Sequence, residues 1–147
     1  MADAATSNTT ASTSPLYVVA VAAIIVRADK VLAMRRSQHK DASAGLWETL
    51  SGRVDAGEEP FETIKREIIE ECGLVTNVDP RPVTSYSAMR ADKPMIVIVY
   101  QADYVSGEVV RSDEHDDHAW VTPDEFVARS SLSKLAKAIY SVFEDII

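Results

Sequence analysis

The chain has 147 residues, 46% of them hydrophobic and 26% charged, which is the size and composition of one globular domain. It carries 23 acidic and 15 basic residues, and a formal charge of −8 argues against binding to duplex nucleic acid, which needs many cationic contacts. The single cysteine, Cys72, excludes an internal disulfide and favours a reducing, cytoplasmic compartment. The longest apolar run, residues 16–26, is too short to span a membrane.

The first segment, residues 1–15, is small and polar and has no periodic apolar face, which is typical of a disordered tail. Residues 16–147 are then expected to form a single domain. The apolar, β-branched run of residues 16–26 predicts a buried strand. A turn at residues 27–30 should lead into a second strand at residues 31–35.

The middle of the chain predicts one helix between polar segments. Residues 37–45 read as a loop, residues 46–50 as a short strand and residues 51–60 as a glycine-bearing loop. Proline suits the first position of a helix, so a helix is expected over residues 60–72. Gly73 is expected to end it, because glycine accepts the left-handed conformation of a helix C-cap.

Four further elements are expected after this helix. Residues 81–89 and 94–105 predict strands, residues 106–118 a polar and acidic loop, and residues 119–121 a short strand.

Two signals mark the helical end of the chain. Thr122, Pro123 and Glu125 match a helix N-cap, a first helical position and a capping box. A last helix from about Ser133 has apolar residues at helical spacing: Leu135, Ile139, Val142 and Ile146. Because strands and helices interleave, the predicted class is α/β or α+β, with helices packed on a mixed sheet.

The helix over residues 60–72 has an unusual distribution of charge. Its apolar stripe consists of Phe61, Ile64, Ile68 and Cys72. Glu67, Glu70 and Glu71 fall beside this stripe, within one arc of the helix surface. The cluster is either a solvated acidic face, partly balanced by pairs of Arg66 with Glu62 and Glu70, or a site for a hard divalent cation.

The residues that precede the helix favour the cation site. From Gly52, the spacing is five residues to Glu58, seven more to Arg66, and then Glu67-Ile68-x-Glu70-Glu71-x-Gly73-Leu74. This pattern resembles the Nudix box, Gx5Ex7REUxEExGU with U aliphatic, at every specified position. The resemblance extends more loosely from Leu16 to about Phe126.

The resemblance implies an α/β/α sandwich with a mixed sheet. It also implies hydrolysis of a nucleoside diphosphate linked to another group, with Mg²⁺ or Mn²⁺ as cofactor. The metal ligands would be the carbonyl of Gly52 and the carboxylates of Glu67, Glu70 and Glu71. Arg66 would orient a glutamate of the box, Glu58 would fix Arg66, and Gly73 would end the helix.

Family members differ in which glutamate is the general base, so Glu70 and Glu114 are both candidates. Glu114 lies in an acidic segment before Trp120, where many members carry a further glutamate. A solvated charge run is the alternative for Glu114. His115 and His118 form an HxxH pattern, but no third zinc ligand is visible, and both are expected on a wet loop.

Two arginines end the second strand at a place where MutT-like members often contact the nucleotide. Arg35 and Arg36 are therefore candidate substrate-binding residues, with surface salt bridges as the alternative. Trp47 is either a base-stacking residue or a core residue, and the core is favoured. The sequence reads Leu50-Ser51-Gly52 where many members have P-G-G, so the pocket beside the box is expected to differ.

The predicted function is therefore metal-dependent cleavage of a phosphoanhydride bond in a small nucleotide. A nucleoside triphosphate, unmodified or oxidised, is favoured over ADP-ribose or another nucleoside diphosphate sugar. A non-catalytic nucleotide-binding Nudix domain is disfavoured, because no box glutamate is lost. An isopentenyl-diphosphate isomerase is disfavoured as well, because Cys72 lies on the box helix. No membrane partner is expected. Dimers are frequent in the family, so a homodimer is possible, and the sequence does not decide the oligomeric state.

Overall fold

The computed structural model describes residues 15–38 and 43–144, so the expected tail and Ile146 lie outside the described residues, apart from Pro15. The strands are β1 (Val18–Arg27), β2 (Lys30–Arg36), β3 (Trp47–Glu48), β4 (Leu50–Arg53), β5 (Val75–Val78), β6 (Thr84–Arg90), β7 (Lys93–Ser106) and β8 (His115–Val121). The helices are α2 (Pro60–Cys72), α3 (Pro123–Arg129) and α4 (Ser133–Glu144).

The strands form one mixed sheet around β1. The path runs β3-β2-β1-β7-β5, and β4 pairs with β1, β6 with β7 and β8 with β2. The central pair, β1 and β7, is parallel and in register from Val18–Met95 to Val26–Asp103. All other strand pairs described are antiparallel. The prediction of a mixed sheet is confirmed.

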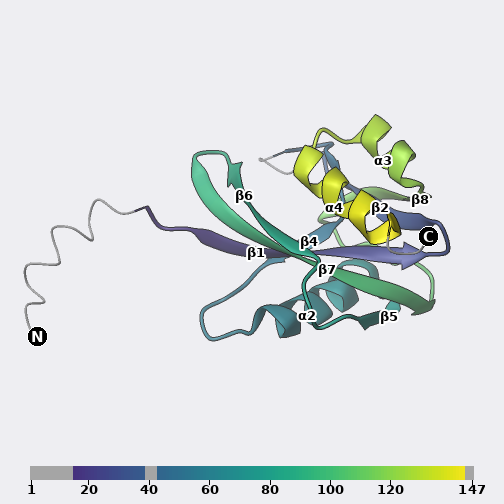
Figure 1. Cartoon of the computed structure of the whole chain (residues 1–147), viewed down its shortest axis with the longest axis horizontal. Coiled ribbons are helices and arrows are strands. Elements are labelled where there is room, and N and C mark those ends of the chain that lie inside the picture. Colours follow the sequence, from purple (N-terminus) through teal and green to yellow (C-terminus); the bar gives the residue numbers. More distant parts are fainter. Residues whose placement is uncertain (1–14, 39–42, 145–147) are drawn as a thin grey trace, which may run out of the picture.

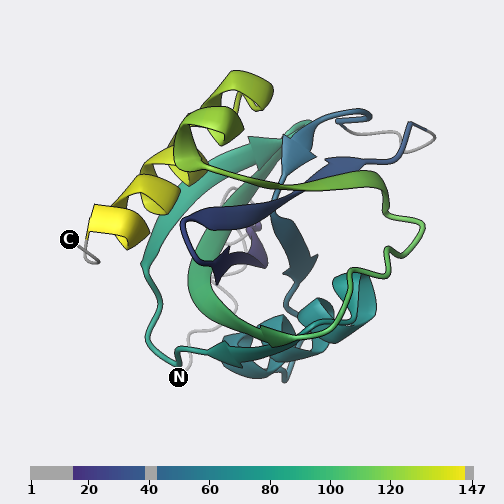
Figure 2. The same cartoon turned by 90° about the vertical axis from the view of Figure 1, so that its right-hand side faces the viewer.

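Helices cover both faces of this sheet. Figures 1 and 2 show α2 on one face and α3 with α4 on the other. Alternate residues of β1 serve the two cores: Val21, Ala23 and Ile25 pack toward α2, and Ala22, Ile24 and Val26 toward α3 and α4. A strand that is buried on both faces has no polar side, which explains the unbroken apolar run in the sequence. The α/β/α sandwich is therefore confirmed.

The predicted helix boundaries are also confirmed. Helix α2 begins at Pro60, and its residues Ile64, Ile68 and Cys72 are almost completely buried. Gly73 has φ = 70°, and its amide donates to the carbonyls of Ile68 and Ile69 at 3.1 Å. The capping box at the start of α3 is formed as expected. Across residues 15–38 and 43–144, no helix is long and apolar enough to cross a bilayer.

Three strand assignments from the sequence were wrong. The segment 51–60 was expected to be a loop, but its first residues belong to β4, which pairs with Ala20–Ala23 of β1. Strand β5 was not predicted, because its four residues, half of them polar, gain their pairing from β7. Strand β8 begins at His115 rather than Ala119, since pairing with β2 overrides its polar composition.

Trp47 lies in the core, as favoured. Its ring packs against the core beneath α3 and α4, and the guanidinium of Arg129 stands 5.0 Å from the ring centroid. Its carbonyl also accepts a hydrogen bond of 2.7 Å from Ser130 Oγ. Trp47 thus fastens β3 to the connection between the last two helices.

Removal of residues 1–14 is predicted to leave both the melting temperature and the kcat unchanged, because this segment has almost no apolar surface to bury. Thermal unfolding followed by circular dichroism tests the first expectation. The matched control removes residues 1–20, which deletes the start of β1 and should lower the melting temperature clearly. A clear loss of stability in the shorter deletion would show that the tail docks on the domain.

Candidate active site

Helix α2 carries an arginine that binds three carboxylates at once. Arg66 Nε and Nη2 donate to the two oxygens of Glu58 at 3.1 and 3.2 Å. Arg66 Nη1 donates to Glu67 Oε2 at 3.2 Å and to Glu70 Oε1 at 3.1 Å. Glu62, expected to pair with Arg66, instead pairs with Lys65. Arg66 therefore neutralises part of the repulsion within the glutamate cluster.

Glu58 is fixed in turn by its own loop. One of its oxygens accepts bonds from the Asp55 amide at 3.1 Å and from Thr63 Oγ1 at 3.0 Å. The Asp55 amide, with smaller contributions from Thr63 and Arg66, holds the pKa of Glu58 below its usual value. Glu58 is thus an ionised anchor that positions Arg66 at the N-terminal half of the helix.

Gly52 on β4 lies directly against Glu67. A Cβ atom on Gly52 would overlap the carboxylate and Cγ of Glu67. A side chain at position 52 would force the Glu67 carboxylate to move, so the glycine leaves free the space that this carboxylate occupies. The main chain of Gly52 is thereby placed beside the carboxylate cluster of α2.

Glu67 and Glu71 are unusually buried for acidic residues, at 9% exposure each. Burial raises the pKa of Glu67, Arg66 lowers it, and the charges of Glu71 and Glu70 raise it again. Carboxylates that destabilise one another's ionised form are the arrangement that a divalent cation would stabilise.

Behind Glu71 lies a buried polar network that the sequence did not predict. Ser112 Oγ donates to Glu71 Oε1 at 2.6 Å. His115 Nε2 and Glu48 Oε2 are 2.9 Å apart, and Arg36 Nη1 is 3.6 Å from the same Glu48 oxygen. The expectation of a wet loop is wrong for His115, which lies on β8 and is only 4% exposed.

Burial alone would lower the pKa of His115. The hydrogen bond to Glu48 and the charges of Glu48 and Glu71 outweigh burial and raise this pKa to about 9. At neutral pH the imidazole is therefore protonated, and its positive charge lies between two buried carboxylates. A buried charge of this kind is stable only when it is paired.

Six of the ten predicted site residues border a cleft of about 530 Å³, and the other four, Arg35, Glu58, Arg66 and Gly73, do not line it. Gly52, Glu67, Glu70 and Glu71 line one part of it, together with Arg36, Glu48 and Glu114. Another part is mostly apolar and is lined by residues of the sheet and the start of α4: Val18, Ala20, Ala22, Tyr86, Ala88, Met95, Val97, Leu132 and Leu135. Basic side chains of β4, β6 and β7 also reach the cleft: Arg53, Arg90 and Lys93.

The two candidate arginines of β2 have different surroundings. Arg36 is buried and lines the cleft, whereas Arg35 does not line it and pairs with Asp116 at 2.7 Å. Successive residues of a strand point to opposite faces, which separates the two side chains. Glu114 lines the cleft as well, and its backbone is held by Ser112 Oγ and by the Ser37 amide.

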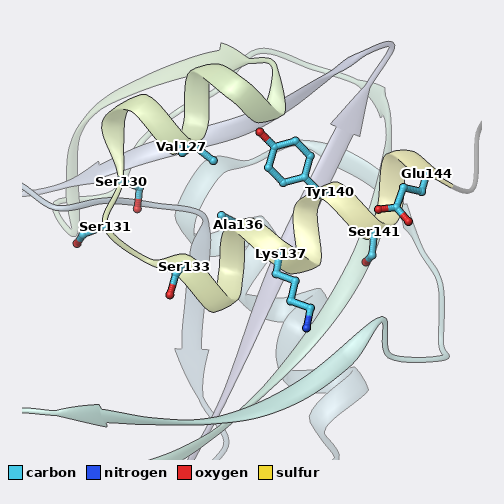
Figure 3. Close-up of a pocket in the computed structure, with 9 residues that line it drawn as sticks. All are labelled: Val127, Ser130, Ser131, Ser133, Ala136, Lys137, Tyr140, Ser141 and Glu144. Atoms are coloured by element: carbon cyan, nitrogen blue, oxygen red, sulfur yellow. The ribbon is translucent and has the colours of Figure 1, made fainter.

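A second cavity, of about 540 Å³, lies against α3 and α4 and is shown in Figure 3. Its lining consists largely of small and hydroxyl-bearing residues, among them Ser130, Ser133 and Tyr140. None of the predicted site residues contributes to it, so the chemistry is assigned to the cleft at α2.

The donor set at α2 suits a hard cation, because carboxylate and carbonyl oxygens are the ligands that Mg²⁺ and Mn²⁺ prefer. Within the described part of the chain, no three acidic, histidine or cysteine side chains already converge on one metal position. Glu67 and Glu70 both pair with Arg66. A cation bound by these two carboxylates would compete with these ion pairs.

Comparison with known proteins agrees with this geometry. The model of the NUDIX domain matches residues 16–145. A MutT-like protein of Streptomyces ambofaciens is 31% identical over 120 residues, which cover 81% of this chain and 73% of that protein. The nucleoside triphosphatase NudI of Escherichia coli is 31% identical over 93 residues, or 56% of this chain and 66% of NudI.

The fold has close structural relatives as well. The crystal structure of a MutT protein from Methanosarcina mazei Go1 matches with a TM-score of 0.74 and 26% identity, over 90% of this chain and 96% of that one. The chain belongs to the Nudix family, and it is a hydrolase of phosphoanhydride bonds. Nudix hydrolases act on small nucleotide substrates and generally use divalent metals.

Sequence reasoning missed the residues that support the glutamates from outside the box. Glu48 is distant in sequence from Ser112 and His115, and it meets His115 because β3 and β8 both pair with β2. The sole available signal was a histidine next to Glu114, and a histidine in a polar segment gives no indication of burial.

Substitution of Gly52 by alanine is predicted to displace Glu67 and to lower kcat by roughly 100-fold, since small displacements of catalytic groups have effects of this size. Gly57→Ala is the matched control: Gly57 has φ = 85°, but a Cβ atom added there would meet no other atom within 4 Å. It should cost about 1 kcal/mol of stability and leave kcat nearly unchanged. Steady-state kinetics and thermal melts of both variants check this, and equal kinetic effects would contradict it.

Proposed function

We propose that this protein is a Mg²⁺- or Mn²⁺-dependent pyrophosphohydrolase whose preferred substrate is a nucleoside triphosphate, unmodified or oxidised. One observation supports this most strongly. The same cleft contains both the carboxylates of Glu67, Glu70 and Glu71 and an apolar recess beside Tyr86. The carboxylates suit a metal-bound polyphosphate, and the apolar recess suits the flat ring of a nucleobase.

The proposed metal ligands are the carbonyl of Gly52 and the carboxylates of Glu67, Glu70 and Glu71. A bound metal would neutralise the phosphate charge and lower the pKa of an attacking water. If Glu67 and Glu70 held a metal, Arg66 would lose its pairs with them and keep its pair with Glu58. Its role is then to keep the helix and its glutamates in place.

A water that attacks phosphorus must lose a proton, so a carboxylate base is needed nearby. Glu70 is a candidate because it is the most exposed of the proposed metal-binding glutamates, with a side chain that is 52% accessible. Glu114 is the second candidate, since it borders the same cleft from a different element. In either case the base would take the proton from the water that the metal activates, so the base and the metal ligands must face the same cleft.

The cationic residues of the cleft support a substrate with several phosphates. Arg36 lies beside the glutamates, and Arg53, Arg90 and Lys93 lie on the strands around the recess. The likeness to NudI, a nucleoside triphosphatase, and to a MutT-like protein supports the triphosphate over ADP-ribose or another nucleoside diphosphate sugar.

The proposal predicts hydrolysis of at least one nucleoside triphosphate with Mg²⁺ or Mn²⁺ and no hydrolysis in EDTA. A library of ordinary and oxidised nucleoside triphosphates, ADP-ribose and nucleoside diphosphate sugars should be compared by kcat/KM, with products separated by chromatography. Glu71→Gln should lower kcat by on the order of 100-fold or more. Glu62→Gln, on the exposed side of the same helix, is the control and should retain activity.

Preference for a nucleoside diphosphate sugar in this screen would contradict the substrate assignment and leave the metal assignment intact. Undiminished hydrolysis in EDTA would contradict the metal assignment.

Glu114→Gln distinguishes two roles for this residue. Loss of a base should lower kcat and alter the acidic limb of the pH–rate profile, whereas loss of a ligand should raise the metal concentration at half activity. Glu108→Gln, an exposed residue of the preceding segment, is the control. Curves for Glu114→Gln that overlay those of the parent across both pH and Mg²⁺ would assign the base to the box instead.

A further inference from the structure

Four buried, ionisable side chains form a row from the wall of the cleft to helix α2. Their exposures are 8% for Arg36, 5% for Glu48, 4% for His115 and 9% for Glu71. They come from β2, β3, β8 and α2, so the row connects four separate elements. Only its last member belongs to the Nudix box.

His115 is the centre of this row. Its Nε2 bonds to Glu48 Oε2 at 2.9 Å, and its Nδ1 faces Glu71 Oε1 at 3.6 Å. This second distance is longer than a hydrogen bond, and Nδ1 is buried without a hydrogen-bond partner. A buried donor left without a partner is unfavourable, so the pairing of Nδ1 with Glu71 is favoured by any shift that brings them closer.

Glu71 Oε1 has a second neighbour on the same side. Ser112 Oγ donates to it at 2.6 Å. The hydrogen bond from Ser112 thus fixes this oxygen from one side, and the imidazole of His115 lies close to the same oxygen. The orientation of Glu71 is therefore set from β8 and the residues just before it.

We propose that His115 is a positioning residue of the metal site, which orients Glu71 through Nδ1 while Glu48 holds the ring through Nε2. This inference rests on the proposed function, in which Glu71 is a metal ligand. Loss of a residue that orients a metal-ligating side chain typically lowers metal affinity 10–100-fold. His118, three residues further along β8, is half-buried and contacts Arg111 instead, so it has no such role.

Two isosteric substitutions separate the two contacts. The amide nitrogen of asparagine can occupy the place of Nδ1, and that of glutamine the place of Nε2. His115→Asn thus keeps a donor toward Glu71 and loses the bond to Glu48, whereas His115→Gln keeps the bond to Glu48 and loses the donor toward Glu71. A purely structural role of the ring predicts similar consequences for both variants.

The test is the affinity for Mn²⁺ alone, measured without nucleotide from the electron paramagnetic resonance signal of the free ion. His115→Gln should bind Mn²⁺ about 10-fold more weakly than the parent, and His115→Asn within about threefold of it. His118→Gln is the matched control and should bind as the parent does. Thermal melts establish that each variant is folded at the temperature of the titration.

Equal affinity in the parent and His115→Gln, or equal losses in His115→Gln and His115→Asn, would overturn the positioning role. If neither His115 variant folds, Glu48→Gln decides, because loosening the ring should still weaken Mn²⁺ binding and an unchanged affinity would overturn the role. Glu71→Gln separates the two proposals. If it binds Mn²⁺ as tightly as the parent, the metal assignment of the proposed function fails together with this inference.

Discussion

The carboxylate of Glu67 lies in the space that a side chain at position 52 would fill, so the absence of a side chain at Gly52 allows it to lie against β4. The apolar stripe of Ile64, Ile68 and Cys72 sets the rotation of α2. With the rotation of the helix fixed, Glu70 and Glu71 border the same cleft as Glu67. The glycine of the box therefore has a steric role in addition to any carbonyl that it offers to a metal.

Arg66 reduces the electrostatic repulsion within the acidic cluster when no cation is bound. Its guanidinium pairs with Glu58, Glu67 and Glu70. Glu58 is not a proposed metal ligand, so its pair with Arg66 would remain when a metal is bound. In the proposed function, a divalent ion would replace Arg66 as the partner of Glu67 and Glu70. A single side chain can in this way stabilise the folded protein before metal binding and retain the helix position afterwards.

The sequence was sufficient for the fold class and for α2, because periodic apolar residues, Pro60 and Gly73 are local signals. It was insufficient for β4, β5 and the start of β8, whose pairing partners override weak or polar local preferences. The box spacing also predicted which glutamates share a cleft, since helix geometry determines that. It could not predict that Glu48, Ser112 and His115 stand behind Glu71, because this depends on the register of strands remote in sequence.

The parallel pairing of β1 with β7 also has a consequence for the order in which the protein can fold. Val18 of β1 pairs with Met95 of β7, which follows 77 positions later in the sequence, so β1 cannot form this pairing until β7 has been synthesised. Contacts of such long range are slow to form, because a large loop must close first. During synthesis, β1 has only β2 and β4 as early neighbours, and until β7 leaves the ribosome one of its edges is unpaired. An unpaired strand edge of this kind can bind a chaperone or pair with a strand of another chain.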